Sequence, residues 1–215
     1  MVETDRGCLC RGRVSRSAQV SRREGKKISS GAVVPRREIT TVSGEPISIP
    51  DTQYLIHLQL RRFAGCPVCN LHLQSIVRRH DEILARGIRE VVVFHSSAQE
   101  LLVHTKRLPF AVIADPQKRL YAEFGAEATP RAVLDPRAWV PIIRGISLCL
   151  WEIAGKRGYV PSINPSGGRF GLPADFLIAT DGRVLAAHYG DHAYDQWSVN
   201  ELLELGPRQN PQLGQ

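Results

Sequence analysis

Phe63-Ala64-Gly65-Cys66-Pro67-Val68-Cys69-Asn70 is the segment around which the rest of the chain is organised. An alternating apolar run precedes it and a run with helical periodicity follows it, which predicts a strand-to-helix turn at the two cysteines. Unpaired backbone N–H groups and the positive end of the helix dipole favour a thiolate at such a helix start. The second sulfur lies about one turn farther on, so Cys66 and Cys69 are expected to open and close a disulfide.

Length and composition predict one globular domain. The chain has 215 residues, of which 43% are hydrophobic and 23% charged, enough for a sizeable core. It contains no run of about 18 apolar residues and no apolar signal core at its start, so we expect no membrane span and no secretion. The five cysteines are scattered and odd in number, which favours a reducing cytoplasm over a disulfide framework.

The net charge of +7 is concentrated at the N-terminus. Residues 1–30 hold eight Lys and Arg against three Asp and Glu, so the remainder is nearly neutral and we expect no nucleic-acid binding. We predict a disordered basic tail over 1–34, a domain over 35–207 with an insertion at about 126–170, and a C-terminal tail over 208–215.

Periodicity and turn signals predict the order of the elements. Strands are expected in a hairpin at 38–50, and at 54–62, 88–94, 110–114, 176–179 and 184–189. Helices are expected at about 67–86, 97–107, 116–124, within 146–155, and at 199–205. The early β-α-β order requires parallel pairing with right-handed crossovers. The prediction is an α/β fold with a single mixed sheet, helices on both faces, and the insertion before the last hairpin.

Four stretches of the chain resemble the thioredoxin fold and, more closely, its peroxiredoxin-like AhpC/TSA group. They are TTVSGEPISIPD (40–51), LQLRRFAGCPVCNLHL (58–73), EVVVFHSSAQELL (90–102) and GLPADFLIATDGRVLAAHYG (171–190). The resemblance covers about residues 38–205 and leaves 126–170 unmatched. It implies that the proline before the third core strand, here Pro173, is cis and faces the sulfurs, and that Leu172 and Pro173 line the substrate site.

The sequence departs from the peroxiredoxin motif at two groups that prepare the peroxide. Peroxiredoxins carry Pro-x-x-x-Thr-x-x-Cys, but an alignment on Cys69 puts Arg62 at the Pro position and Cys66 at the Thr position. The arginine of the late strand is replaced by Pro173. These replacements are typical of dithiol exchange. Arg61 or Arg62, at the end of the first core strand, is the candidate source of positive charge.

Two chemical mechanisms use the same cysteine pair. In dithiol exchange, Cys66 attacks a disulfide and Cys69 resolves the mixed species. In a peroxidase, Cys69 or Cys66 becomes a sulfenic acid, the other cysteine condenses with it, and an external reductant resets the pair. We therefore predict a thiol oxidoreductase acting on disulfides or peroxides. The alternative from another class is a non-enzymatic module that binds a partner through the Pro173 side or the insertion.

Three further residues are candidates for supporting roles. His95 ends a core strand beside two serines, at the edge where ligand sites form in such sheets. Asp175 closely follows Pro173. His72 shares the helix with Cys69, and we expect it to be exposed. A Cys₂ metal half-site would need a histidine such as His72 or His95 to converge on it.

No cofactor and no metal are expected. The expected partners are a thiol reductant of the thioredoxin or glutathione type and a disulfide or peroxide substrate, with a homodimer as one arrangement that the resemblance allows.

Overall fold

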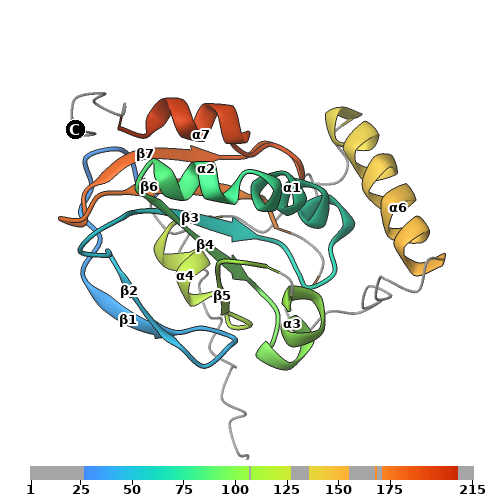
Figure 1. The fold of residues 1–215 in the computed structure, drawn as a ribbon, viewed down its shortest axis with the longest axis horizontal. Coiled ribbons are helices and arrows are strands. Elements are labelled where there is room, and N and C mark those ends of the chain that lie inside the picture. The colour runs from blue at the N-terminus through green and yellow to red at the C-terminus, as the bar shows by residue number, and fades with distance from the viewer. Residues whose placement is uncertain (1–26, 107, 127–135, 155–167, 169–170, 208–215) are drawn as a thin grey trace, which may run out of the picture.

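The computed structural model describes residues 27–106, 108–126, 136–154, 168 and 171–207. Its centre is a five-stranded mixed sheet in the order β5-β4-β3-β6-β7 (Figure 1). β3, β4 and β5 pair in parallel, whereas β6 pairs antiparallel with β3 and β7. The predicted α/β class with a mixed sheet is confirmed. The strands are β3 (Leu55–Arg61), β4 (Ile88–Phe94), β5 (Ala111–Ala114), β6 (Ala174–Ile178) and β7 (Val184–Tyr189).

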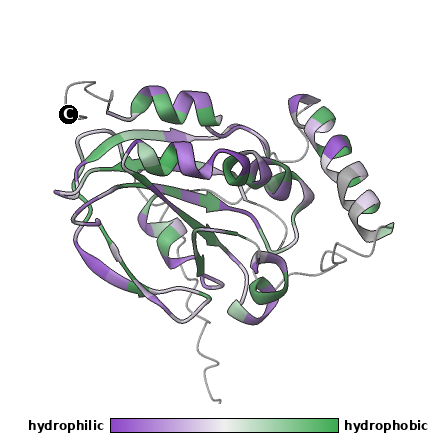
Figure 2. Cartoon of the chain, viewed as in Figure 1, coloured by the Kyte–Doolittle hydropathy of each residue, from purple (hydrophilic) through white to green (hydrophobic). Residues whose placement is uncertain are grey.

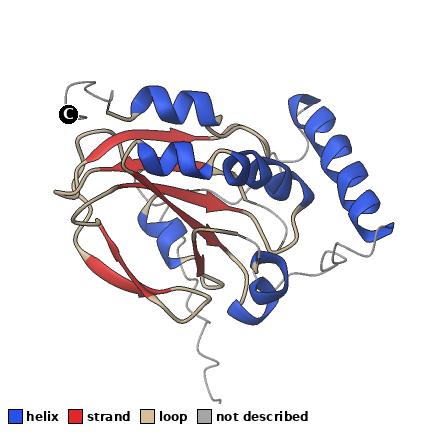
Figure 3. Cartoon of the chain, viewed as in Figure 1, coloured by secondary structure: helices blue, strands red, loops and turns tan. Residues whose placement is uncertain are grey.

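Helices cover both faces of this sheet, as Figure 3 shows. One face, called here the α1 face, packs against α1 (Pro67–Arg78), α2 (His80–Ala85), α3 (Ala98–Thr105) and α7 (Val199–Leu205). The opposite face packs against α4 (Arg119–Glu123) and against the hairpin of β1 (Arg37–Thr40) and β2 (Pro46–Ile49). Right-handed crossovers from β3 to β4 and from β4 to β5 place α1, α2 and α3 on the same side.

The two faces of β3 differ in character because its side chains alternate across the sheet. Ile56, Leu58 and Leu60 join the apolar core on the opposite face. His57, Gln59 and Arg61 point to the α1 face, and all three are fully buried. Figure 2 shows the neighbouring strand β4 in the green of apolar residues. The sequence predicted a strand with one partly polar face but gave no sign that this face is buried.

The N-terminal boundary of the domain lies earlier than predicted. Val34 is buried in the core, and its N–H donates to the Gly182 carbonyl at 2.8 Å. The N–H of Ile28 donates to the Tyr189 hydroxyl at 2.7 Å. The prediction of a disordered tail up to residue 34 is therefore wrong for residues 28–34, while residues 1–26 lie outside the described ranges.

Two predicted helices have different bounds. The helix expected over 67–86 is divided at Arg79, whose backbone (φ −120°, ψ 20°) is not helical. The helix expected from 116 begins only at Arg119, because the Asp115 carboxylate accepts the N–H groups of Arg119 and Leu120 at 2.9 and 2.8 Å. The pattern Ser97-Ala98-Gln99-Glu100 predicts a capping box for α3, and Ser198 is the predicted cap of α7; both are confirmed, and Ser198 also forms a capping box, with Glu201.

The insertion contains a helix longer than expected. A short 3₁₀ turn, η1 (Pro136–Ala138), precedes α6 (Trp139–Ala154). Apart from Ala126 and Gly168, the remainder of the predicted insertion lies outside the described part, as does the side chain of Cys149. α6 packs beside the start of α1 (Figure 1). No helix in the described ranges combines the length and apolar character needed to cross a bilayer. Among the described side chains of α6, six large apolar ones are exposed on its outer face, those of Trp139, Val140, Ile143, Ile146, Leu150 and Trp151.

We expect Gly182→Ala to destabilise the domain more than Gly44→Ala does. Both glycines have a positive φ, +87° and +91°, where another residue costs roughly 1–2 kcal/mol. A Cβ at Gly182 would lie 2.6 Å from the Val34 carbonyl oxygen, whereas a Cβ at Gly44 meets nothing within 4 Å. Urea denaturation should give a larger loss for Gly182→Ala by about 1 kcal/mol or more. Equal losses would mean that residues 31–34 do not pack as described.

Candidate active site

The structure places both cysteines at the turn between β3 and α1. Cys66 is the N-cap of α1, and its Sγ accepts the backbone N–H of Cys69 at 3.5 Å. Pro67 occupies the first helical turn, where a missing N–H costs no hydrogen bond. The expected strand-turn-helix setting of the pair is therefore confirmed.

The two sulfurs have opposite acid–base character. Burial raises the pKa of Cys66, but the thiol of Cys69, the positive charge of Arg62 and the backbone N–H groups of Cys69 and Val68 outweigh it and lower this pKa to about 6. The pKa of Cys69 is raised well above its usual value, because its proton bonds to the Cys66 sulfur and because it is buried. At neutral pH the pair therefore holds one thiolate, at Cys66, and one thiol, at Cys69.

The turn that carries Cys66 is braced by the end of β4. The Ala64 N–H donates to the Ser96 hydroxyl at 2.9 Å, and the His95 N–H donates to the Arg62 carbonyl at 3.1 Å. The Arg62 side chain is buried, and its guanidinium carbon lies 5.4 Å from the centroid of the Phe63 ring. The predicted supporting residue Arg62 thus lies beside the cysteine pair.

His104 is a residue near this turn that the sequence did not indicate. Gly65 has φ +73°, and a Cβ there would lie 2.8 Å from the His104 ring. The imidazole on α3 therefore occupies the space that a side chain at position 65 would fill. Burial lowers the pKa of His104, and Glu100 partly offsets this. No periodicity or motif marks His104, because only the packing of α3 against the turn brings it there.

The predicted residue His95 lies close to the segment before β6. Its side chain is buried, and within the described part of the chain neither ring nitrogen has a hydrogen-bond partner. Burial and the charge of Lys118 lower the pKa of His95 to about 4, so the ring is neutral. A Cβ at Gly171 would lie 3.2 Å from His95 Nε2 and 3.9 Å from Arg62 Cγ. The chain leading to Leu172 and Pro173 therefore passes beside both supporting residues.

The expected cis bond at Pro173 is wrong. Among the described residues the cis peptide bond is Ile49–Pro50, so Leu172–Pro173 is trans. The Pro173 carbonyl accepts the Gly190 N–H at 2.9 Å, and the Pro173 ring lies against Gly190. These contacts hold Pro173 against the end of β7.

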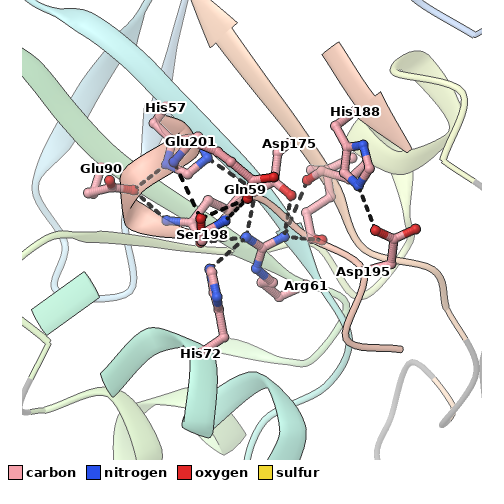
Figure 4. Close-up of polar contacts among 12 residues, drawn as sticks. His57, Gln59, Arg61, His72, Glu90, Asp175, His188, Asp195, Ser198 and Glu201 are labelled. Atoms are coloured by element: carbon pink, nitrogen blue, oxygen red, sulfur yellow. Dashed lines mark hydrogen bonds and ion pairs between the residues drawn. The ribbon is translucent and has the colours of Figure 1, made fainter. Parts of the chain in front are cut away.

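A buried polar network lies on the α1 face and includes the third predicted supporting residue, Asp175 (Figure 4). Arg61 Nη2 donates to Asp175 Oδ1 at 2.5 Å and to Gln59 Oε1 at 2.7 Å. His57 faces Asp175 at 3.1 Å and Glu90 at 2.8 Å, and Gln59 also donates to Glu90. Asp175 therefore acts within this network, because its contacts are with His57 and Arg61.

The charges in the network stabilise one another. Burial lowers the pKa of His57, but Glu90 and Asp175 outweigh it and raise this pKa to about 9. Burial raises the pKa of Asp175, but Arg61 and His57 hold it well below its usual range. Two cations, His57 and Arg61, thus face two carboxylates, Glu90 and Asp175, which is the balance that burial of charges requires.

His72 connects this network to α1, and the expectation that it is exposed is wrong. The side chain is buried, and its Nε2 lies 3.3 Å from Arg61 Nη2. Burial and the charge of Arg61 lower its pKa well below the usual value, so His72 accepts a hydrogen bond from Arg61 as a neutral ring. Within the described ranges no group of three or more His, Cys, Asp or Glu side chains is arranged to hold a metal ion.

Access to the sulfurs is narrow. Cys66 is 2% exposed and Cys69 is 4% exposed. α6 contributes to this cover, since a Cβ at Gly145 would lie 2.8 Å from the Pro67 carbonyl oxygen and Ile142 packs against the cluster that contains both cysteines.

Comparison with known protein families shows which family this chain belongs to. Residues 75–192 match the AhpC/TSA antioxidant enzyme family. The chain belongs to this family. The matched segment, which is more than half of the protein, begins after Cys66 and Cys69, so membership rests on the fold that follows the cysteine turn. No curated protein matches the chain.

Solved structures of a peroxidoxin, a peroxiredoxin and a thiol peroxidase share this fold. Peroxidoxin BcpB from Mycobacterium tuberculosis has a TM-score of 0.56 at 14% identity, over 83% of this chain and 96% of that one. A mutant of the peroxiredoxin 6 of Arenicola marina has a TM-score of 0.58 at 15% identity, over 82% and 70%. A thiol peroxidase from Chromobacterium violaceum has a TM-score of 0.53 at 11% identity, over 84% and 87%. The predicted thioredoxin-like fold is thereby confirmed.

The raised pKa of His57 predicts how stability depends on pH. An unfolded histidine titrates near 6.5, so the stabilisation from protonated His57 is complete below pH 6.5 and is lost as pH rises through about 9. The lowered pKa of Cys66 acts in the opposite direction, because a folded thiolate adds stability as pH rises above about 6. In a Cys66→Ser, Cys69→Ser background, which removes both thiols, the free energy of unfolding should therefore fall between pH 7 and pH 10, by up to about 3 kcal/mol.

Chemical denaturation across this pH range checks the expectation. His57→Gln should be less stable overall and should lose most of this pH-dependent fall. In the background without the two thiols, a curve that stays flat from pH 7 to pH 10, or a slope that His57→Gln leaves unchanged, would contradict a protonated His57.

Proposed function

We propose that this AhpC/TSA family member is a thiol peroxidase in which Cys66 reacts with peroxide and Cys69 resolves the product. The observation that carries this proposal is the asymmetry of the pair, with a thiolate at the N-cap Cys66 and a protonated thiol at Cys69. A low pKa makes a cysteine a nucleophile at neutral pH, and a neighbouring thiol is what a sulfenic acid condenses with.

The proposed reaction proceeds in two steps. The Cys66 thiolate attacks one peroxide oxygen, the O–O bond breaks, and the departing oxygen takes a proton from solvent, which leaves Cys66 as a sulfenic acid. The Cys69 thiol then attacks the Cys66 sulfur, so that a disulfide forms and water leaves. Two electrons pass from the dithiol to the peroxide. An external thiol reductant must return them before the next turnover.

The burial of both sulfurs favours a small peroxide over a protein disulfide as the oxidant. A disulfide in another protein needs an exposed sulfur to attack, whereas Cys66 is 2% exposed and Cys69 is 4% exposed. Hydrogen peroxide, with two heavy atoms, is little larger than water and needs only a narrow passage to the pair.

The neighbouring residues have separate roles in this proposal. Arg62 stabilises the thiolate and the negative charge on the departing oxygen. His95, with Leu172 and Pro173 on the adjacent segment, forms the substrate side of the site, a placement supported by the contact of Gly171 with His95 and Arg62. Asp175 is a positioning residue that holds Arg61 at the end of β3. We further propose that the protein works in a reducing compartment such as the cytoplasm.

The proposal predicts fast oxidation of the reduced protein by hydrogen peroxide. Stopped-flow mixing with rapid alkylation and mass spectrometry should detect a sulfenic acid on Cys66 and then a Cys66–Cys69 disulfide. Cys69→Ser should accumulate the sulfenic acid, and Cys66→Ser should react at least about 100-fold more slowly. Arg62→Gln should slow the reaction at pH 6–7, because less thiolate is present.

Three other results of the oxidation experiment would contradict or replace this proposal. Equal reactivity of both single variants would contradict the assignment of Cys66. Slow reaction with peroxide but fast exchange with a disulfide substrate through Cys66 would make the protein a dithiol exchanger. If neither reaction occurs, the alternative of a non-enzymatic partner-binding module replaces the proposal.

A further inference from the structure

A cavity of about 330 Å³ lies between the second half of α1 and the segment that leads into α7. This volume is at the lower end of the range for small-molecule sites. Polar side chains line the cavity on both sides. They include His72, Ser75, Arg78 and Arg79 of the α1 region and Tyr194 and Gln196 of the segment before α7. The mechanism proposed above does not use this cavity.

The charge of the cavity favours an anion. Its lining contains two arginines and no carboxylate. Arg79 is engaged by Glu82 at 2.7 Å and by Asn200 at 2.6 Å. Arg78 is exposed at the rim, and within the described ranges it makes no ion pair. A carboxylate that enters the cavity therefore meets one guanidinium without having to displace an existing partner.

Polar groups inside the cavity add hydrogen-bond donors. The side-chain nitrogen of Gln196 is buried and, in the described part of the structure, has no partner. His72 uses Nε2 for Arg61, so the other ring nitrogen of this neutral imidazole carries a proton. A buried amide donor without a partner is costly, and a bound acceptor would remove that cost.

The cavity lies next to the cysteine pair. Tyr194 lines it and also packs against the apolar cluster that contains Cys66 and Cys69. His72 follows Cys69 by three residues on α1, which is about 4.5 Å along the helix axis. Arg78 follows Cys69 by nine residues, or about 13 Å. An extended tripeptide covers about 10 Å, and the arginine side chain closes the remaining distance.

We propose that this cavity binds the reductant of the Cys66–Cys69 disulfide, and that the reductant is a peptide thiol of about three residues carrying free carboxylates, as glutathione does. Arg78 binds a carboxylate at the rim, and Gln196 and His72 donate to peptide oxygens within. This inference rests on the proposed function, because it concerns the step that regenerates the dithiol.

A ligand in this cavity approaches the disulfide from the Cys69 side, and the chemistry of reduction is compatible with attack on that sulfur. The thiolate of the first ligand attacks Cys69 Sγ, a ligand–Cys69 disulfide forms, and Cys66 leaves as a thiolate. The thiolate of a second ligand attacks the ligand sulfur, and Cys69 leaves and takes up a proton. Two thiols have then become one disulfide, with two electrons transferred to the protein. The sulfur with the lower pKa is the better leaving group, and that sulfur is Cys66.

The first test measures the reductive step alone. The disulfide is formed with diamide rather than peroxide, and its reduction by glutathione and by uncharged dithiothreitol is followed by alkylation and mass spectrometry. We expect saturation with glutathione in the wild type and an about 10-fold slower reaction in Arg78→Gln, from loss of one charge-assisted hydrogen bond. The rate with dithiothreitol should not change.

Arg119→Gln is the matched control. Arg119 is an exposed arginine on α4, on the opposite face of the sheet, so this variant has the same charge change and should behave as the wild type. Equal rates of Arg78→Gln and Arg119→Gln with glutathione would overturn the inference. So would a glutathione rate that rises linearly without saturation.

The second test needs no redox step. S-methylglutathione, which cannot react, is titrated into the full-length Cys66→Ser protein while the side-chain amide signal of Gln196 is followed by NMR. A saturable shift that weakens in Arg78→Gln supports the inference, and the absence of a shift contradicts it. Because neither test uses peroxide, failure of the peroxidase proposal would appear only in the oxidation experiment.

Discussion

The contact between the Cys69 thiol and the Cys66 sulfur is the interaction on which the proposed chemistry of this protein depends. It exists because β3 ends where α1 begins, which puts one sulfur at the cap and the other one turn along. The same geometry gives the pair its asymmetry, since Cys69 donates to Cys66 and Arg62 adds positive charge. Burial alone would raise the pKa of both thiols, so this turn must supply the stabilisation of the thiolate.

The buried network on the α1 face is the second constraint. His57, Gln59 and Arg61 occupy successive inward positions of β3. Replacing them with apolar residues would give a simpler core, and buried ion pairs are weak contributors to stability. These polar residues instead hold neighbouring elements in place. Arg61 contacts β6 through Asp175 and contacts α1 through His72. The network thus fixes the end of β3, directly before the turn that carries Cys66.

Local signals in the sequence were sufficient for most of the fold. The capping box at Ser97, the cap at Ser198 and the turn at Gly182 are decided within a few residues, and the structure has all three. Burial of His72, the contact of His104 with Gly65, and the Arg61–Asp175 pair join segments far apart in the chain. Such contacts leave no periodic pattern. The expected cis bond at Pro173 came from resemblance alone, and the trans bond shows that this feature does not carry over.

The most direct test of the central claim is the pH dependence of alkylation at each cysteine. The reduced protein is treated briefly with iodoacetamide from pH 4 to pH 10, and the modification of Cys66 and Cys69 is quantified separately by mass spectrometry. The reactivity of Cys66 should rise with a midpoint near pH 6, while Cys69 stays unreactive below about pH 9. A midpoint for Cys66 at 8.5 or above, or a lower midpoint for Cys69 than for Cys66, would contradict it.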